Sequence, residues 1–322
     1  MALSDMERYE DDIYTSTIEL LGQKLEAFNA ASNNAAVLSM AAWRGSYSKE
    51  AFFSQLAGAQ RRVNRLSANA TQAATTLSMG ENVGVKVAGG FGPVLFEPAQ
   101  ISWINEDPVA AISAIAEGFA DALLADQLNA VIGAAVAAVE NNSALVNDVS
   151  ATTGLSQTVL NGSHAKFTDM SGLLRTDFMT GGAYHNLIDK ALANGEQLFD
   201  STSVTVVSIL GKTIVVSDIP ALYEAGTPNK TKVLSVVSMG IICDNAGDII
   251  TNMETSNGKN RIETTWQADY SFGVKLKGYS WDTTNGGESP TDAALFTGSN
   301  WDKSVAEDKH TLGTLAIADA DQ

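Results

Sequence analysis

The feature that most constrains the fold is a long alanine-rich run, which predicts one helix from Pro108 to Val139. Asp107 is a candidate N-cap, and Pro108 suits the first helical position, where a backbone N–H has no partner in any case. Apolar residues then recur at helical spacing, at Val109, Ile112, Phe119, Leu123, Leu128, Val131, Val136 and Val139. The helix would have roughly nine turns and a length of about 48 Å, well above the average. Its many alanines would let neighbouring elements approach closely.

A membrane-spanning helix is the competing interpretation of this run. Glu117, Asp121 and Asp126 interrupt its apolar character, and the uncharged stretch 127–139 is shorter than the roughly 20 residues that span a bilayer. We therefore expect a helix that packs inside a soluble protein, and no association with a membrane.

Composition and charge narrow the functional class. The chain has 322 residues, of which 45% are apolar, so it can bury a sizeable core. Only 18% are charged and 7% aromatic, so the surface relies on Ser, Thr, Asn and Gly, which suits a protein extensively covered by other protein. The net charge of −17 disfavours tight nucleic-acid binding, which depends on Lys and Arg replacing counterions. Arg61, Arg62 and Arg65 form a local basic cluster within this acidic chain.

Cysteine usage and the N-terminus indicate the compartment. Cys243 is the only cysteine, so an intrachain disulfide and a cysteine-based metal site are excluded. It ends an apolar run, which favours a small buried hydrophobic residue over a nucleophile. The acidic N-terminus has no positive region followed by an apolar stretch, so we expect no signal peptide and a protein that stays in the cytoplasm where it is made.

Two regions precede the long helix. Residues 1–42 are expected to form a loosely held N-terminal arm, with a helix over 18–28 and a break in the small-residue stretch 29–34. Residues 43–98 begin with helical material over 51–66 and end in two short alternating runs that contain glycines. These runs indicate an extended two-stranded excursion with little core of its own.

The region 173–220 predicts a helix followed by a hairpin. Apolar spacing predicts a helix over 181–192, with Gly195 placed to stop it. Two β-branched runs on either side of Gly211 and Lys212 predict paired strands, and Pro220 cannot continue a central strand. This segment contains few groups that an enzyme could use, so we expect its role to be structural.

The last part of the chain is strand-rich and then becomes polar. The nearly continuous apolar run 233–243 predicts one buried strand, and alternation over 262–281 predicts one or two long strands. Residues 283–322 are rich in Gly, Ser, Asp and Ala, and we expect a peripheral tail.

The candidate reactive groups do not form a site. His164, His185 and His310 have no ligand spacing, and a lone histidine on a helix is more often structural than a ligand or base. The glycine-rich stretch 89–93 lacks the Lys-Ser/Thr of a phosphate loop, which favours a flexible or turning element. Residues 244–248 lack the bidentate glutamate of a calcium loop. We expect no catalytic residue, no metal and no cofactor.

The order of these elements, together with two short motifs, resembles a known family. The motifs are R-x-x-F-x-x-G-G-x-Y-x-x-L-I at 175–188 and ILGKTIVVSDIP at 209–220. With a loose arm, an extended excursion, a long helix, a mixed region and late long strands, the chain resembles the major capsid proteins of tailed bacteriophages, which have the Hong Kong 97 type fold. The resemblance implies an α+β fold with an N-arm (1–42), an E-loop region (43–98), a spine helix and P-domain (99–144), an A-domain (145–265), a returning P-domain strand (266–282) and a C-terminal tail (283–322).

The resemblance also implies a function and contact residues. The chain would self-assemble, as pentamers and hexamers, into an icosahedral shell that encloses viral double-stranded DNA without binding it tightly. Scaffolding, portal and decoration proteins are the further partners that the family suggests. The expected inter-subunit contacts of the E-loop are Arg61, Arg62, Arg65 and Lys86, and the expected capsomer core of the A-domain comprises Arg175, Tyr184, His185, Gly211, Lys212, Asp218 and Pro220. No covalent crosslink through Lys86 is expected.

Two alternatives stay open. An encapsulin-like compartment would share this fold but enclose cargo enzymes instead of DNA. An α/β enzyme with a site around His185 and Asp244 belongs to a different functional class, and the loss of catalysis on replacing His185 would favour it.

Overall fold

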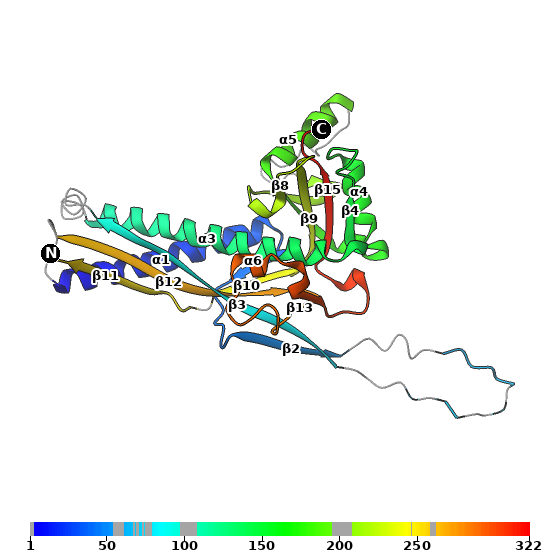
Figure 1. The fold of residues 1–322 in the computed structure, drawn as a ribbon, viewed down its shortest axis with the longest axis horizontal. Helices are drawn as coiled ribbons and strands as arrows, with labels where there is room; N and C mark the ends of the chain where they lie inside the picture. Colours follow the sequence, from blue (N-terminus) through cyan, green and yellow to red (C-terminus); the bar gives the residue numbers. More distant parts are fainter. Residues whose placement is uncertain are drawn as a thin grey trace.

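The computed structural model describes residues 3–53, 61–66, 68, 71–72, 74, 79–96, 108–194, 208–245, 247–257 and 262–322. Two sheets share one long helix, and together they form an elongated body with a taller part at one end (Figure 1). The six-stranded sheet runs in the order β1-β10-β12-β3-β2, with β11 added on β12, and the seven-stranded sheet in the order β4-β15-β9-β5-β7-β6, with β8 added on β9.

The six-stranded sheet comprises β1 (Ala36–Ser39), β2 (Tyr47–Phe53), β3 (Met79–Phe96), β10 (Ile241–Asn245), β11 (Ile250–Ser256) and β12 (Glu263–Leu276). The seven-stranded sheet comprises β4 (Val146–Asp148), β5 (Leu174–Met179), β6 (Ser208–Ile209), β7 (Lys212–Val216), β8 (Tyr223–Glu224), β9 (Lys230–Val237) and β15 (Gly313–Asp319). A small pair, β13 (Tyr279–Trp281) and β14 (Trp301–Lys303), completes the strands of the described residues. The helices are α1 (Leu3–Ala31), α3 (Pro108–Glu140), α4 (Gln157–Ala165), α5 (Gly181–Asn194) and α6 (Asp292–Leu295).

The predicted long helix is confirmed as α3, with 33 residues, or about 50 Å at 1.5 Å per residue. Every residue from 130 to 139 is buried, which fits a helix that is apolar all round. Among the described residues, α3 is also the one helix long and apolar enough to cross a membrane, but 67% of its most apolar window is buried inside the protein. It is therefore the core helix of this fold. The predicted cap, Asp107, lies outside the described residues.

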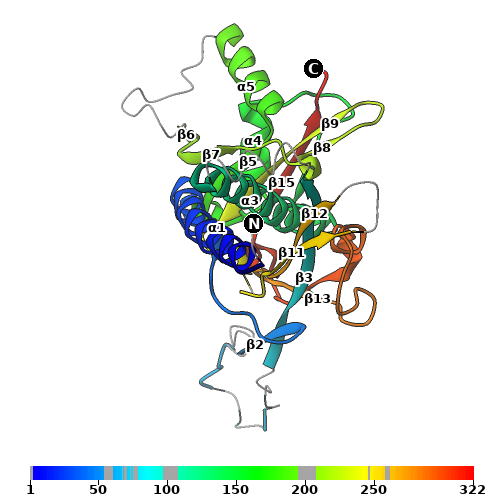
Figure 2. The ribbon, with the colours of Figure 1, turned by 90° about the vertical axis from the view of Figure 1, so that its left-hand side faces the viewer.

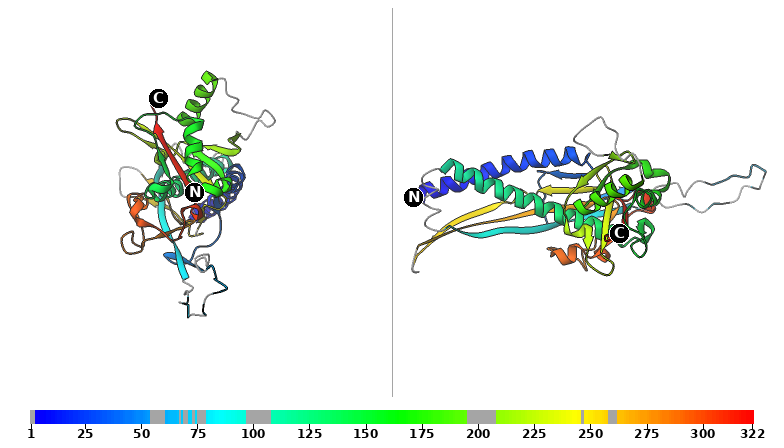
Figure 3. Two further views of the ribbon diagram at one scale, coloured as in Figure 1. Left: turned by 90° about the vertical axis from the view of Figure 1, so that its right-hand side faces the viewer. Right: turned by 90° about the horizontal axis from the view of Figure 1, so that it is seen from above.

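The N-terminal helix is longer and more tightly packed than the sequence predicted. α1 spans 29 residues and lies beside α3 over one face of the six-stranded sheet (Figures 2 and 3). Ile13, Leu21 and Leu25 are buried, because their spacing of four or eight residues keeps them on the face towards α3. The prediction of a loosely held arm is therefore wrong, whereas the predicted break is confirmed where α1 ends at Ala31.

The six-stranded sheet contains one long strand where the sequence predicted two short ones. β3 has 18 residues; its first part pairs with β2 and its second part with β12, and the registers overlap at Val85. The glycine-rich stretch 89–93 lies inside β3 and is not a loop. The predicted helix over 51–66 is wrong at both described ends, since β2 continues to Phe53 and residues 61–66 are not helical.

The apolar run 233–243 forms two strands in different sheets, not one. β9 ends at Val237 and β10 begins at Ile241, and the turn between them places Met239 at a φ of 55°. The chain therefore leaves the seven-stranded sheet inside the region predicted as the A-domain, and β10, β11 and β12 belong to the six-stranded sheet. Of the one or two long strands predicted over 262–281, one is confirmed as β12, with 14 residues, and the three-residue β13 follows it.

The C-terminal region is not peripheral, so the prediction of a tail over 283–322 is wrong. β15 lies between β4 and β9 in the seven-stranded sheet, and each of its residues is buried. Leu295 and Trp301 are also buried. Small residues such as Ala316 and Ala318 lower the apparent hydropathy of β15, but they allow it to pack beneath α4 and α5 in a cluster with Leu160 and Leu187. The last strand therefore completes the core.

Aromatic residues fill the space between α3 and the six-stranded sheet. The Phe119 ring on α3 lies 5.3 Å from both Phe91 on β3 and Trp266 on β12, measured between ring centroids.

On the sheet, a Cβ added at Gly273 would lie 2.0 Å from Trp43 Cε3, so glycine is required for this tryptophan to pack against the strands. Trp43 is 6% exposed.

Candidate functional site: an assembly surface

The arm formed by β2 and the first part of β3 leads to a basic segment, residues 61–66. Its side chains are all exposed, Val63 at 65% and Leu66 at 96%. Arg61, Arg62 and Arg65 form no ion pair with any described residue. Unpaired arginines beside exposed apolar side chains have the composition of a protein interface.

Lys86 differs from these arginines. It pairs with Asp248 of the same chain, and Ser271 donates a hydrogen bond of 3.1 Å to the same carboxylate. Lys86 therefore has an acidic partner within its own chain, and its contact with a neighbouring subunit stays a prediction. The hydrogen bonds of Lys86 and Ser271 hold the pKa of the Asp248 carboxyl below its ordinary value.

Asp244, named in the enzyme alternative, also serves the fold of its own chain. Its Oδ1 accepts a hydrogen bond of 2.7 Å from Ser39, and its Oδ2 lies 3.5 Å from Lys275 Nζ. These contacts join β1, β10 and β12 on one face of the sheet. The neighbouring Cys243 is buried, as predicted, and burial raises the pKa of its thiol, which makes it a poor nucleophile.

The predicted A-domain residues fall into exposed and structural groups. Arg175 is exposed beside a register shift between β5 and β9, and His185 is exposed on α5 with its ring centroid 5.6 Å from that of Tyr184. Asp218 Oδ1 accepts a hydrogen bond of 3.1 Å from the backbone N–H of Gly181 and so caps the start of α5. Pro220 begins a short 3-10 turn, Pro220–Leu222, that packs on α3. α5 is described as far as Asn194, and the predicted stop, Gly195, lies outside the described residues.

The predicted hairpin joins β6 to β7 through Leu210 and Gly211, which have φ angles of 53° and 74°. Both angles are left-handed, as a two-residue hairpin turn of this twist requires. Lys212 is not part of the turn. Its Nζ is buried and donates to the backbone carbonyls of Ser171 and Leu174, at 3.1 and 2.8 Å, and burial lowers the pKa of its ammonium group.

A buried polar cluster beneath α4 was not predicted. His164 Nε2 lies 3.3 Å from Asp177 Oδ1 and 3.1 Å from Ser235 Oγ, and all three side chains are buried. The residue types resemble those of a hydrolase, but all three side chains are buried, so a substrate cannot reach them in this conformation. They come from α4, β5 and β9, so no local motif could have revealed them.

A second unpredicted contact fastens α3 to the seven-stranded sheet. Lys232 on β9 is 9% exposed and lies 2.8 Å from Glu140, at the end of α3, and 3.0 Å from Glu224. Burial alone would lower the pKa of Lys232, but the hydrogen bonds and charges of the two glutamates outweigh it and raise that pKa. In the described ranges, no three His, Cys, Asp or Glu side chains gather closely enough to hold a metal ion.

Comparison with solved structures places this architecture among phage capsid proteins. A capsid subunit of cyanophage Pam1 aligns with a TM-score of 0.53 and 12% identity over 86% of each chain. A chain from Mycobacterium phage Bobi aligns with 0.53 and 14% over 90% of this chain and 89% of that one, and one from Microbacterium phage Oxtober96 with 0.50 and 12% over 90% of each. At these identities the likeness shows the fold.

Sequence comparison identifies the family. Among curated protein sequences, none is similar enough to this chain to count as a relative. Residues 5–315, however, match the family described as major capsid protein 13-like, which is nearly the whole chain. The protein therefore belongs to the major capsid protein 13-like family, has the Hong Kong 97 type fold of tailed-phage capsids, and is a capsid shell protein.

Proposed function

We propose that this chain forms pentamers and hexamers of an icosahedral head shell that encloses viral double-stranded DNA, and that contacts through the basic segment join neighbouring copies. The observation that supports these contacts is the exposed 61–66 stretch, whose three arginines have no ion-pair partner among the described residues although the chain carries a net charge of −17. Positive charge that is unpaired in an acidic chain is available to another copy of that chain.

The acidic total also suits a container for DNA. A shell must enclose the genome without holding it at many sites, and a net negative charge prevents the counterion release that would drive tight binding. We assign no catalytic activity to the chain, no cofactor, and assembly in the host cytoplasm before the shell becomes part of the virion. Scaffolding, portal and decoration proteins are its proposed further partners.

Electron microscopy of the purified protein tests this proposal. We expect closed shells tens of nanometres across, and a uniform small oligomer would contradict the proposed shell. Particles from infected cells should contain nuclease-protected DNA. Protein cargo in place of DNA would favour the encapsulin-like alternative.

Charge reversal tests the role of the arginines. Arg61→Glu together with Arg65→Glu should block shell formation while the subunit stays folded, because two attractive contacts become repulsive at every copy of the interface. Circular dichroism of the unassembled subunit provides the folding control. Normal shells from this variant would refute the role of the basic segment.

A further inference from the structure

Residues 40–46 cross one face of the six-stranded sheet, and we call them the strap. They join β1 to β2, which stand at opposite ends of the strand order β1-β10-β12-β3-β2. Ser39, the last residue of β1, lies in one row across the sheet with Gly273 on β12. Tyr47, the first residue of β2, lies in the next row with Val274. The strap therefore runs almost straight across β10, β12 and β3.

The strap has little spare length. Its ends are four strand intervals apart in the sheet, which is about 19 Å at ~4.8 Å per interval. The eight Cα steps from Ser39 to Tyr47 cover at most about 26–29 Å when fully extended. Part of that length is needed to rise above the strands. A connection this short keeps its middle residue, Trp43, close to the sheet.

Trp43 is the buried residue of a strap that is otherwise exposed or half-buried. Its ring lies where two glycines leave room. A Cβ added at Gly84 on β3 would lie 2.8 Å from Trp43 Cη2, and Gly273 on β12 is closed to a side chain by the same ring. These glycines alternate with Val85 and Val274, which belong to the core, so they lie on the face of the sheet away from α3.

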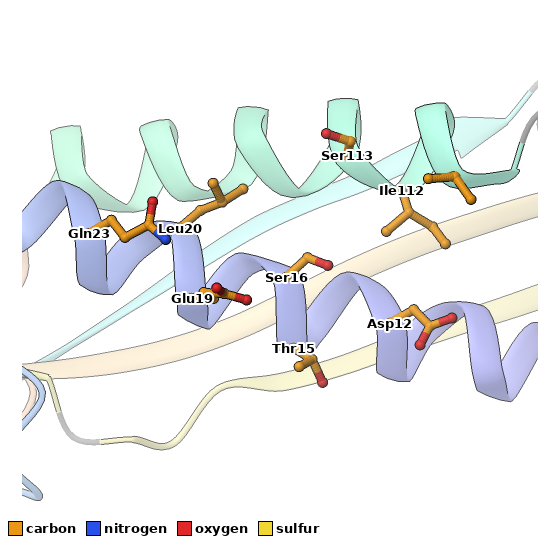
Figure 4. A pocket seen from close by; sticks show the side chains of 9 residues that line it. Asp12, Thr15, Ser16, Glu19, Leu20, Gln23, Ile112 and Ser113 are labelled. Atoms are coloured by element: carbon orange, nitrogen blue, oxygen red, sulfur yellow. The ribbon is translucent and has the colours of Figure 1, made fainter.

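The two faces of this sheet are covered in different ways. On one face α1 and α3 pack together, and Figure 4 shows Leu20 of α1 directed towards α3 and Ile112 of α3 directed towards α1. On the other face the strap contributes one buried side chain, Trp43. A connection held at one point is released when that side chain moves, whereas a helix packed along its length is not.

Lys275 connects Trp43 to the arm formed by β2 and the first part of β3. Its Nζ lies 5.0 Å from the ring centroid of Trp43, 3.0 Å from Glu50 on β2 and 3.5 Å from Asp244 on β10. The ring attracts the ammonium group electrostatically. The ion pair with Glu50 fastens β2 at the same point, so the strap and the arm share one anchor.

This anchor lies at the base of the arm. Gly84, beneath the ring of Trp43, precedes Val85, where the pairing of β3 with β2 meets its pairing with β12. From here towards Met79 the ladder partner of β3 is β2, and Figure 1 shows these two strands leading away from the body. A side chain seated at this position can set the angle between the arm and the body.

Two features allow the strap to release Trp43. The indole Nε1 is buried without a hydrogen-bond partner among the described residues, so packing and the nearby ammonium group hold the ring, not a hydrogen bond of its own. Gly45 has a φ of 79°, and no atom lies within 4 Å of where its Cβ would be. An unhindered glycine in a left-handed conformation is suited to act as a hinge.

We propose that the strap is a conformational latch for the arm. With Trp43 seated on Gly84 and Gly273, the arm leaves the body in one direction. With Trp43 off these glycines, the strap turns about Gly45 and the arm swings about Val85. The latch belongs to the single subunit, so it goes beyond the proposed function and is tested below the protein concentration at which shells form.

Distances between spin labels measure the direction of the arm. The labels are attached through Ala51→Cys on β2 and Glu117→Cys on α3, two exposed positions, while the native Cys243 is buried. Double electron–electron resonance on the full-length subunit should give one narrow distance distribution. Trp43→Ala should at least double its width, because the arm is no longer held. Trp43→Phe keeps a ring over the glycines and should leave the width nearly unchanged.

A second variant and a control accompany this pair. Gly84→Ala removes no side chain, but its methyl group would displace the ring of Trp43, so it should broaden the distribution as Trp43→Ala does. The control is Leu315→Ala, which removes buried atoms from the core of the seven-stranded sheet. It should leave the distribution narrow, although it destabilises the subunit.

Hydrogen exchange provides a readout that needs no label. The backbone N–H of Lys86 donates a hydrogen bond of 3.0 Å to the carbonyl of Ser46, at the end of the strap. The N–H of Leu234, in the middle of the seven-stranded sheet, reports opening of the whole subunit. In Trp43→Ala, exchange at Lys86 should accelerate by a factor about tenfold larger than at Leu234, because release of the strap exposes Lys86 alone.

The outcomes decide the role of the strap. A distribution that stays narrow in both Trp43→Ala and Gly84→Ala would overturn the latch. Equal broadening in Leu315→Ala, or equal acceleration of exchange at the two amides, would also overturn it, because a general loss of stability would then explain the effect. If Trp43→Ala does not fold, Gly84→Ala decides alone. Failure of the wild type to form shells would contradict the proposed function and leave these results unaffected.

Discussion

Replacing Leu315 with alanine tests whether the C-terminal strand belongs to the core. Leu315 is 0% exposed in β15, where it pairs with Val146 on one side and Leu234 on the other. The substitution removes three carbon atoms, which corresponds to about 2.4 kcal/mol of transfer free energy at ~0.8 kcal/mol per carbon. Strands on both sides limit collapse of the site, so a cavity adds to this loss, and we expect a total of about 3–4 kcal/mol.

The matched control is Leu66→Ala, the same chemical change at a side chain that is 96% exposed. It should alter the free energy of unfolding by less than about 0.5 kcal/mol. Both variants are measured as unassembled subunits by urea titration, followed by tryptophan fluorescence. The expected pattern is reciprocal: Leu315→Ala weakens the subunit, whereas Leu66→Ala weakens only assembly. A loss below about 1 kcal/mol for Leu315→Ala would refute the placement of β15 in the core.

Three further predictions concern the body of the subunit. Gly273→Ala should destabilise it by about 1–3 kcal/mol, because the new methyl group would overlap the packed side chain of Trp43. Gly118→Ala, on the open face of α3, should instead stabilise it by about 0.5–1 kcal/mol. Urea titration measures both changes. Asp126→Asn should retain the hydrogen bond donated by Tyr270. Burial raises the pKa of Asp126 in the folded state above its ordinary value of 3.8, so ionisation of this carboxyl opposes folding. Asp126→Asn should therefore be more stable than the wild type at pH 7, and this difference in the free energy of unfolding should shrink as the pH falls through the raised pKa. Urea titrations at several pH values measure the difference, and its growth on acidification would contradict the prediction. Lys232→Met should lower the free energy of unfolding by about 1–2 kcal/mol. This is less than the loss for a fully buried ion pair, because both partner glutamates are over a third exposed. An unchanged urea midpoint would exclude a stabilising role for the contact.

The sequence predicted best those elements whose signal is local and long. α3 repeats its apolar spacing over many turns, and β12 alternates between apolar and polar residues over most of its length. Each pattern is long enough that single residues that do not fit it leave the prediction unchanged. The hairpin at Gly211 was predictable for a related reason, because its turn needs left-handed angles.

The sequence analysis missed those elements whose residues make sense only through contacts with distant parts of the chain. The small residues of β15 look like those of a loop until α4 and α5 are placed over them, and the glycines of β3 look like turns until Trp43 and Tyr270 are placed against the strand. For the candidate site, the exposed arginines could be identified from a local cluster of charge. The buried cluster at His164 could not, since its members meet only in the folded protein.

The continuity of β3 has a mechanical consequence. The strand that carries the arm is the same strand that pairs with β12 inside the body, and Val85 belongs to both ladders. Antiparallel hydrogen bonds lie across the strands, so a pull along β3 shears the whole ladder at once, whereas a pull across it would open the bonds one at a time. Tension applied to the arm by a neighbouring copy would therefore spread over the length of the six-stranded sheet. The subunit would then transmit mechanical load between its neighbours as well as cover its area of the shell.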